Sequence, residues 1–353
     1  MTTVEFVGPE HYQAWERYVF SHRHGGPYLS LAWREAVERG YGHRAFYLAA
    51  FQGAELKGVL PLFLLKPPLP GCRGALVSLP FCDYGGVLAD CDGIAHALLA
   101  RATELAREVG AGLEIRSAVE LPALAQAGGG AQVADKCRML LTLPGSAALL
   151  WDGFKSKLRS QIKKAGRDGL LCRLGGIELF LDFYQVFSRN MRDLGSPVHA
   201  EGFLRSVLAA YGERARVGVV WKEDTPAAAG IILSHGGMVT IPWASALREF
   251  NRFSPNMLLY WTLLEYAAES GFACFDFGRS TPGEGTYKFK EQWGAVPAPL
   301  FWWRFVPPGE GRAPAASGEK SRSLRGCAEW CWQRLPLPVA NSVGPLLRKY
   351  VSL

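Results

Sequence analysis

Residues 215–221 read ARVGVVW, residues 227–234 read AAAGIILS, and residues 239–245 read VTIPWAS. Short runs of apolar and β-branched residues, separated by turn residues, predict three consecutive strands. A polar loop and a helix over residues 255–269 follow, and FACFDFG (272–278) ends the segment as a fourth strand. The pattern predicts three strands, a helix and a further strand in one sheet.

The same order of elements occurs earlier in the chain. Residues 44–117 contain RAFYLAAF, GVLPLFLL and ALVSLPF, then a DYGG loop, a helix over residues 94–109 and the strand GLEIRS. The two segments agree in the order and length of their elements rather than in residue identity, which predicts an internal structural repeat. A Pro-Gly pair in TLPGSAA indicates a boundary near residue 145. The predicted organisation is two domains, 1–145 and 146–306, with a linker and tail over 307–353.

Three further elements precede the strands of the second copy. LLCRLG (170–175) predicts a first strand, and helices are expected over residues 178–194 and 200–211. The resulting order, βααβββαβ, is that of the acetyltransferase (GNAT) fold. We therefore expect an α/β (α+β) protein of two tandem GNAT-like (acyl-CoA N-acyltransferase) domains, with mixed, mostly antiparallel sheets. Ser254 is the expected N-cap of the helix that begins at Pro255.

Composition excludes a disordered or fibrous chain, because 49% of the 353 residues are hydrophobic. No signal peptide and no apolar run of about 20 residues is present, so we expect a cytoplasmic protein. The eight cysteines form no C-x-x-C pair and lie in no spacing suited to zinc, so we expect no metal and mostly buried thiols. The net charge of +7 indicates an anionic partner.

The stretch WDGFKSKLRSQIKKAGRDG (151–169) predicts one amphipathic helix. Its apolar stripe is Trp151, Phe154, Leu158, Ile162 and Ala165, and its other faces carry Lys155, Lys157, Arg159, Lys163, Lys164 and Arg167. A basic run of this kind is either a solvated helix face or a phosphate site, in which side chains one turn apart bind the same anion.

The stretch WASALREFNRFSPN (243–256) is expected to form a polar loop before a helix. In a GNAT-like sheet, this loop opens beside the strands where substrates bind. Trp243, Ser245, Arg248 and Asn256 are therefore candidates for orienting a ligand, or they brace the loop. His199 lies in another polar stretch, LGSPVHAEGF, and is a further candidate.

The densest polar group follows a strand, in FDFGRSTPGEGTYKFKEQWGA (275–295). Acyl transfer to an amine requires a group that stabilises an oxyanion and a group that accepts a proton. Arg279 or a lysine can do the first, and Asp276 is the candidate for the second, unless the two form a structural ion pair. Tyr287, Lys288 and Lys290 follow a glycine-rich turn. The sequence contains no G-x-S-x-G, Walker, H-E-x-x-H or dinucleotide motif.

Four of these stretches together resemble the Fem-type transferases, and more closely the Fem-like proteins associated with exosortase and exopolysaccharide systems. They are FKSKLRSQIKKA (154–165), NMRDLGSPVH (190–199), IPWASALREFNRFSPN (241–256) and residues 275–295; CDYGG (82–86) is the most recognisable loop of the first copy. The resemblance implies transfer of an amino acid from aminoacyl-tRNA to a cell-wall precursor amine. The lysine of the family's terminal F-K motif matches Lys290. The long helical arm of some members is not visible here.

These observations predict an acyl- or aminoacyl-transferase that acts on an amine of a cell-envelope or exopolysaccharide precursor. Lys290, Arg279 and Asp276 are the expected catalytic residues. The donor is aminoacyl-tRNA or acyl-CoA, no cofactor is bound, and the acceptor is a lipid- or nucleotide-linked glycan. An acetyl-CoA-type N-acyltransferase is the alternative, although RFSPN replaces the usual pyrophosphate loop, and a non-catalytic binding module is a third possibility. The basic and apolar residues of the tail are compatible with packing on the protein or with contact to the inner membrane.

Overall fold

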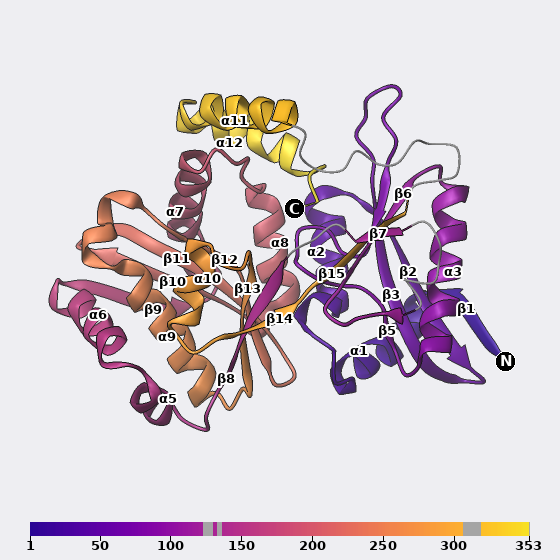
Figure 1. Ribbon diagram of the computed structural model, residues 1–353, viewed down its shortest axis with the longest axis horizontal. Helices are drawn as coiled ribbons and strands as arrows, with labels where there is room; N and C mark the ends of the chain where they lie inside the picture. Colours follow the sequence, from indigo (N-terminus) through magenta and orange to yellow (C-terminus); the bar gives the residue numbers. More distant parts are fainter. Residues whose placement is uncertain (123–129, 133–135, 306–318, 353) are drawn as a thin grey trace. The chain divides into compact units, whose positions relative to one another are not determined.

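The computed structural model describes residues 1–122, 130–132, 136–305 and 319–352, and the chain divides into two units (Figure 1). Unit 1 comprises Met1–Cys137, Ala298–Ala316 and Tyr350–Leu353, and unit 2 comprises Arg138–Pro297 and Ser317–Lys349. Each unit thus includes a segment from a distant part of the sequence. Residues 307–318 of the predicted linker lie outside the described residues, and residues 319–323 begin α11 instead of continuing the linker.

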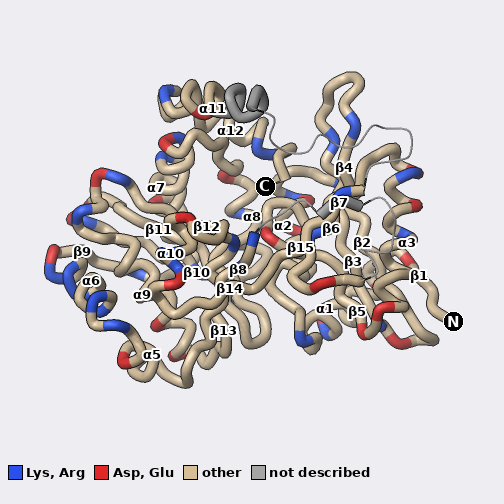
Figure 2. The backbone as a smooth tube through the Cα atoms, viewed as in Figure 1, with Lys and Arg blue, Asp and Glu red and all other residues tan. Residues whose placement is uncertain are grey.

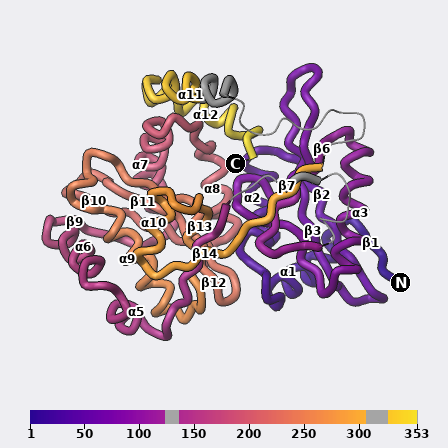
Figure 3. The backbone as a smooth tube through the Cα atoms, in the orientation of Figure 1, coloured from indigo at the N-terminus to yellow at the C-terminus, as the bar shows by residue number. Residues whose placement is uncertain are grey.

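Unit 1 is built on an eight-stranded sheet in the order β1-β2-β3-β4-β6-β15-β7, with β5 paired to β3. Figure 3 shows the orange segment of β15 running between β6 and β7, where it pairs antiparallel with both. The strands are β1 (Thr2–Phe6), β2 (Arg44–Gln52), β3 (Glu55–Leu65), β4 (Ala75–Val77), β5 (Leu88–Ala89), β6 (Gly112–Ser117), β7 (Gly130–Gln132) and β15 (Phe301–Phe305). The helices are α1 (Tyr12–Ser21), α2 (Leu31–Tyr41) and α3 (Asp92–Glu108), with short 3-10 turns at Pro9–His11 and Pro27–Leu29.

The core of unit 1 lies between α3 and the central strands. Ile94, Leu98 and Leu105 of α3 pack in one cluster with Leu48 of β2 and Leu60 of β3. The predicted strands and helix of the first copy are confirmed as β2, β3, β4, α3 and β6. The third strand is shorter than predicted, because it ends at Val77 and the chain turns away from the sheet.

Unit 2 is built on a seven-stranded sheet in the order β14-β8-β13-β12-β11-β10-β9. The strands are β8 (Cys137–Thr142), β9 (Leu170–Gly175), β10 (Ala215–Lys222), β11 (Thr225–His235), β12 (Met238–Ala246), β13 (Cys274–Ser280) and β14 (Val296–Pro299). The helices are α5 (Ala147–Gly153), α6 (Ser156–Arg167), α7 (Phe180–Asp193), α8 (Glu201–Tyr211), α9 (Pro255–Glu269), α10 (Gly285–Glu291), α11 (Glu319–Gln333) and α12 (Leu337–Arg348); 3-10 turns lie at Ile177–Leu179, Gly212–Arg214 and Arg248–Phe253.

The predicted order βααβββαβ is confirmed by β9, α7, α8, β10, β11, β12, α9 and β13. Helix α9 lies very close to the sheet at Gly218, where a Cβ atom would be 3.1 Å from both Leu259 and Leu263. A side chain at this position of β10 would push the helix away from the strands. Only β12 and β13 are parallel among the sheet pairings described for unit 2, and only β4 and β6 among those described for unit 1. The sheets are mixed and mostly antiparallel, as predicted.

Three local predictions are wrong. The helix predicted over residues 151–169 is two helices, because Phe154 and Lys155 take extended backbone between α5 and α6. The loop expected over residues 243–256 is shorter, because residues 243–246 belong to β12 and a 3-10 turn over Arg248–Phe253 follows. Ser254 is the N-cap of α9 as predicted, although its φ is 58° and its side chain makes no capping bond. The cysteines are not mostly buried, since Cys72, Cys91, Cys327 and Cys331 are exposed.

The C-terminal tail forms two helices, α11 and α12, rather than one short helix. Ala340 and Gly344 of α12 are buried, whereas Val339, Val343, Leu346 and Leu347 are exposed. Contact of this face with a membrane surface stays a prediction.

Candidate active site

The candidate site of unit 2 lies where β12 and β13 separate. The two strands pair in parallel over three residues only, Met238 to Thr240 against Cys274 to Asp276. Strand β12 then continues to Ala246 and β13 to Ser280 without pairing to each other. Beyond Thr240 and Asp276, β12 and β13 are therefore not joined to each other by strand pairing.

Lys290 of α10 reaches this open end from the next helix. Its Nζ donates hydrogen bonds to the carbonyl oxygens of Gly278 at 3.1 Å and Arg279 at 2.8 Å, and the side chain is 8% exposed. Consecutive carbonyls of a regular strand point in opposite directions, but Gly278 has φ 73° and interrupts this alternation. The glycine thus lets one ammonium group bind two successive carbonyls and brings a buried positive charge to the end of β13.

Asp276 is fully buried, and its Oδ2 lies 3.1 Å from Nε of Arg138 on β8. Its Oδ1 accepts a hydrogen bond from the backbone N–H of Gly278 at 2.8 Å. Burial, followed by the negative charge of Asp276, raises the pKa of the Cys274 thiol on the same strand. Asp276 therefore holds the backbone at Gly278 and pairs with Arg138. Arg138 was not predicted as a site residue, although it is the one charged residue in the apolar strand CRMLLT (137–142) and such a residue needs a partner when buried.

The other candidates from the glycine-rich stretch lie around this end in different environments. Arg279 is half-buried, and so is Tyr287 on α10. Lys288 is exposed, although it is two residues from the buried Lys290. In a helix, residues two apart point in different directions, so the two lysines do not act on one group as they would in a strand.

Trp243 and Ser245 lie on β12 beyond its pairing with β13, opposite Ile231 and Ala229 of β11, and are both buried. The indole of Trp243 meets the rings of His199 and Phe203 edge-on, with centroids 5.9 Å and 6.0 Å away. The Oγ of Ser245 accepts a hydrogen bond from Nδ2 of Asn190 on α7 at 3.0 Å. Asn190 was not predicted as a site residue, although Asn190 is the first residue of the NMRDLGSPVH stretch.

His199 is a buried histidine that connects the C-terminal helix to this region. Its Nε2 accepts a hydrogen bond from Nε of Arg348 at 3.1 Å, and its carbonyl oxygen accepts one from the Tyr184 hydroxyl at 3.1 Å. Burial, together with the charge of Arg348, lowers the pKa of His199 well below 6.5. Nε2 can accept a hydrogen bond only when the ring is neutral, so the bond from Arg348 is consistent with the lowered pKa of His199.

Arg248 and Asn256 flank the start of α9. Arg248 is exposed, and its Nη2 donates to the carbonyl oxygen of Asp193 at 3.5 Å. Asn256 is half-buried in the first turn of α9. The N–H of Met257 in this turn donates to the carbonyl of Ser254, so it is engaged by the chain itself.

Basic positions are concentrated along α6 (Figure 2), and the side chains of Lys157, Lys163, Lys164 and Arg167 are exposed, whereas Arg159 is half-buried. Arg159, Lys163 and Arg167, each one turn from the next, line an open depression of about 810 Å³ together with Ser156, Ser160 and Gly166. Lys164 points elsewhere, and its Nζ donates to Oδ2 of Asp168 and to the carbonyl of Arg252, both at 2.7 Å. Lys157 is exposed and does not line the depression. Of the predicted phosphate-binding residues, Arg159 and Lys163 line this depression together, whereas Lys157 and Lys164 do not. Arg167 is the third cation that lines it.

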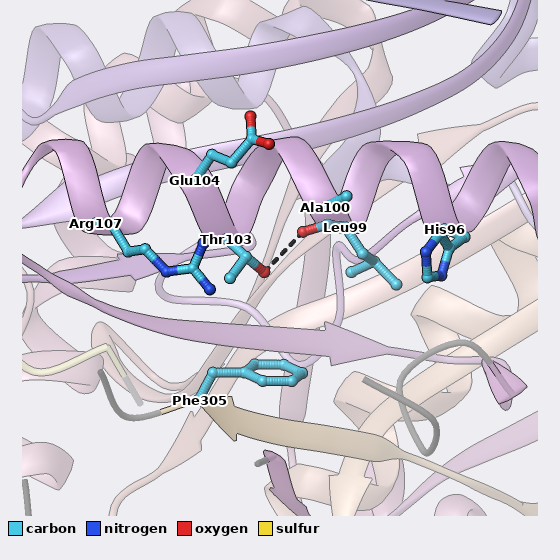
Figure 4. A pocket seen from close by; sticks show the side chains of 7 residues that line it. All are labelled: His96, Leu99, Ala100, Thr103, Glu104, Arg107 and Phe305. Carbon is cyan, nitrogen blue, oxygen red and sulfur yellow. Dashed lines mark hydrogen bonds between the residues drawn. The ribbon is translucent and has the colours of Figure 1, made fainter. Parts of the chain in front are cut away.

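Unit 1 has a smaller hollow between α3 and β15, with a volume of about 270 Å³ (Figure 4). His96, Thr103 and Arg107 lie along one side of it and Phe305 on the other. The Thr103 hydroxyl donates to the carbonyl of Leu99 in its own helix at 2.8 Å. Leu99, Ala100 and Glu104 complete the lining, and Glu104 lies on the same helix as Arg107.

Among the described residues, no group of histidine, cysteine and carboxylate side chains is arranged to hold a metal ion. None of the helices in the described part of the chain has both the length and the apolar character needed to cross a bilayer.

Comparisons with known proteins agree with this architecture. A sequence profile of the acetyltransferase (GNAT) domain matches residues 153–291. Among solved structures, FemX aligns with a TM-score of 0.68 at 17% identity, over 93% of this chain and all of its own. The L-PGS of Bacillus licheniformis aligns with a TM-score of 0.57 at 14% identity, over 99% of this chain and 98% of its own. A tandem GNAT protein from the clavulanic acid biosynthesis pathway aligns with a TM-score of 0.57 at 13% identity, over 88% of this chain and all of its own.

No curated protein sequence gives a significant match. The chain therefore has a tandem GNAT fold, as its sequence predicts, and the profile match lies in the unit that carries Lys290.

Proposed function

We propose that the chain is an acyl- or aminoacyl-transferase that acts on an amine of a cell-envelope or exopolysaccharide precursor. The observation that supports this most is the buried Lys290 ammonium at the separated ends of β12 and β13 in a GNAT-type unit. The acceptor amine attacks the donor carbonyl carbon, and negative charge develops on the carbonyl oxygen. The ester bond of aminoacyl-tRNA or the thioester bond of acyl-CoA then breaks, and the tRNA hydroxyl or the CoA thiol leaves with the proton that the amine gives up. A fixed positive charge in a partly water-excluded site stabilises that oxyanion more than it stabilises the neutral carbonyl.

Asp276 has a supporting part in this proposal. A proton acceptor must be within reach of the attacking amine, but Asp276 is 0% exposed and already engaged by Arg138 and by the Gly278 N–H. Its carboxylate therefore positions the backbone on which Lys290 is anchored. Arg279 and Tyr287, which are half-buried beside that backbone, are placed to contact the substrate.

The donor is proposed to carry phosphate. Arg159, Lys163 and Arg167 present three cations along one face of α6, and a row of this kind binds a phosphate chain by charge and by hydrogen bonds. Aminoacyl-tRNA and acyl-CoA both offer such groups. Aminoacyl-tRNA is preferred because the first turn of α9, where a CoA pyrophosphate would bind, begins with Pro255 and has its Met257 N–H engaged by Ser254.

The test is binding of the purified full-length chain to an aminoacyl-tRNA pool and, separately, to acyl-CoA thioesters. The variant carries Lys163→Glu and Arg167→Glu, and the control carries Arg205→Glu on α8 of the same unit. We expect aminoacyl-tRNA binding that weakens steeply between 50 and 200 mM salt, falls at least tenfold in the double variant and is unchanged in the control.

Binding of acyl-CoA alone would replace the preferred donor with the acetyl-CoA-type alternative. Binding of neither donor, with an unaltered fold, would contradict a transferase and favour a non-catalytic binding module.

A further inference from the structure

Unit 1 repeats the central arrangement of unit 2. Strands β4 and β6 pair in parallel over three residues, Ala75 to Val77 against Gly112 to Glu114, and the N–H of Ser78 then donates to the Glu114 carbonyl at 2.9 Å. The last paired residue of the second strand is acidic in both units, Glu114 here and Asp276 in unit 2. Each acid binds an arginine on the neighbouring strand, with Arg304 Nε 2.8 Å from Glu114 Oε2. This end of the sheet in unit 1 therefore corresponds in strand order to the candidate active site of unit 2.

A buried arginine, Arg116, lies on β6 two residues beyond Glu114. It is 1% exposed, and its Nε donates to Oε1 of Glu114 at 2.8 Å. Its Nη1 donates to the carbonyl of Cys82 at 3.2 Å, and the face of Trp302 lies 4.9 Å from its guanidinium carbon. A buried guanidinium is stable only when its N–H groups are bonded, so the atoms that complete its shell matter.

That shell is completed by a segment from the far end of the sequence, Tyr350–Ser352. Arg116 Nη1 donates to the backbone carbonyl of Ser352 at 3.3 Å, and Nη2 donates to its Oγ at 2.6 Å. The N–H of Phe81 donates to the same carbonyl at 2.8 Å. The ring of Tyr350 meets the ring of His43 edge-on at 5.8 Å. The contacts thus recognise a carbonyl, a hydroxyl and an aromatic ring of one short segment.

The loop that supplies the Phe81 N–H is held in an unusual conformation. Leu79 and Phe81 have φ 64° and 67°, a region that bulky side chains rarely adopt. The loop is secured by Trp302, whose Nε1 donates to the carbonyl of Asp83 at 2.9 Å, and by Gly85, whose N–H donates to the carbonyl of Arg116 at 3.1 Å. Backbone strain of this kind persists where the surroundings fix it, and it is common at ligand sites.

We propose that the end of β6 around Arg116 is a second binding site of the protein, specific for a peptide segment with an aromatic residue two positions before a serine. In this structure the site is filled by the chain's own Tyr350–Ser352. The recognition combines a charged donor and a backbone N–H on one carbonyl with a side pocket for a ring, as in sites that capture peptide segments. Because the occupant is tethered, a free peptide competes only when the tether is weakened or removed.

The test uses a fluorescent peptide, RKYVSL, with the sequence of residues 348–353. It is titrated into the full-length chain and into a chain that ends at Lys349. We expect the peptide to bind the shortened chain at least tenfold more tightly than the full-length chain. Arg116→Lys in the shortened chain should weaken binding at least tenfold, because lysine lacks the forked donors that reach carbonyl and hydroxyl together. Arg101→Lys on α3 is the control, because this half-buried arginine pairs with Glu108 rather than with Tyr350 or Ser352.

A second variant keeps the test decisive if the shortened chain does not fold. The full-length chain with Tyr350→Ala and Ser352→Ala loses the ring and the hydroxyl but keeps the backbone, and it should admit the peptide where the original chain does not. Equal binding by all folded forms, binding that ignores Arg116→Lys, or no binding to any folded variant would each overturn the proposal. These outcomes do not depend on donor binding at α6 or on turnover, so they are distinct from a failure of the proposed function.

Discussion

The Nε atom of Arg138 on β8 lies 3.1 Å from Oδ2 of Asp276 on β13, and both side chains are almost completely buried. The pair joins two strands of unit 2 directly beneath the open end that holds Lys290. The same carboxylate accepts the N–H of Gly278, so the ion pair and the backbone turn are parts of one arrangement.

Replacing Arg138 with leucine should leave the Asp276 charge buried without its partner. We expect a loss of about 3–5 kcal/mol in the free energy of unfolding, as for other broken buried pairs. Urea unfolding followed by circular dichroism measures it. The exposed pair of Arg159 and Asp152, 4.0 Å apart, is the control, since Arg159→Leu should cost less than about 1 kcal/mol. A loss below about 1 kcal/mol for Arg138→Leu would show that the pair does not hold β8 on β13.

Gly278 should not tolerate a side chain. Its φ of 73° is unfavourable for alanine, so Gly278→Ala should destabilise unit 2 by about 1–2 kcal/mol. It should also disturb the two carbonyls that bind Lys290. Gly285→Ala is the matched control, because this glycine begins α10 and a Cβ there would meet nothing within 4 Å. Equal unfolding midpoints for the two variants would argue against the strained turn.

The stability of the protein should fall as the pH drops below about 6.5 because of His199. Its pKa in the folded state lies well below the 6.5 of the unfolded chain, since burial and Arg348 disfavour the charged ring. The unfolded chain therefore binds a proton that the folded chain does not. The stability from His199 is complete above pH 6.5 and is lost, at about 1.4 kcal/mol per pH unit, as the pH falls.

Urea unfolding at several pH values between 7.5 and 5.5 checks this, with His199→Gln as the comparison. The variant should lose the part of the pH slope that His199 supplies, whatever its absolute stability. An identical slope in both proteins would show that His199 is not held neutral.

The sequence predicted the fold well where local pattern decides it. The short apolar runs around Val217, Ile231 and Ile241, separated by turn residues, are typical of strands, and the structure has β10, β11 and β12 at these positions. The break between α5 and α6 was not predicted, because Trp151 and Phe154 keep the helical spacing across it. That break depends on tertiary packing, in which Phe154 meets the rings of Trp261 and Trp293.

Lys290, Arg279 and Asp276 are close together in sequence, and the structure places all three at the end of β13. The partners of these residues were not predictable from spacing, because Arg138 and Asn190 reach the site from distant elements. The membership of β15 was not predictable from local pattern either. This strand follows all the strands of unit 2 in the sequence, but it belongs to the sheet of unit 1. The roles of the site residues stay predictions.

The central claim is tested most directly by single-turnover transfer from a labelled aminoacyl-tRNA or acyl-CoA to an amine-bearing envelope or polysaccharide precursor, with Lys290→Met beside the original chain. Methionine is an unbranched side chain only one atom shorter than lysine, and it removes the charge. The account predicts a rate at least a hundredfold lower, or about 2.7 kcal/mol of lost transition-state stabilisation, in a variant whose circular dichroism spectrum and donor affinity are preserved. An undiminished rate in the folded variant would contradict it.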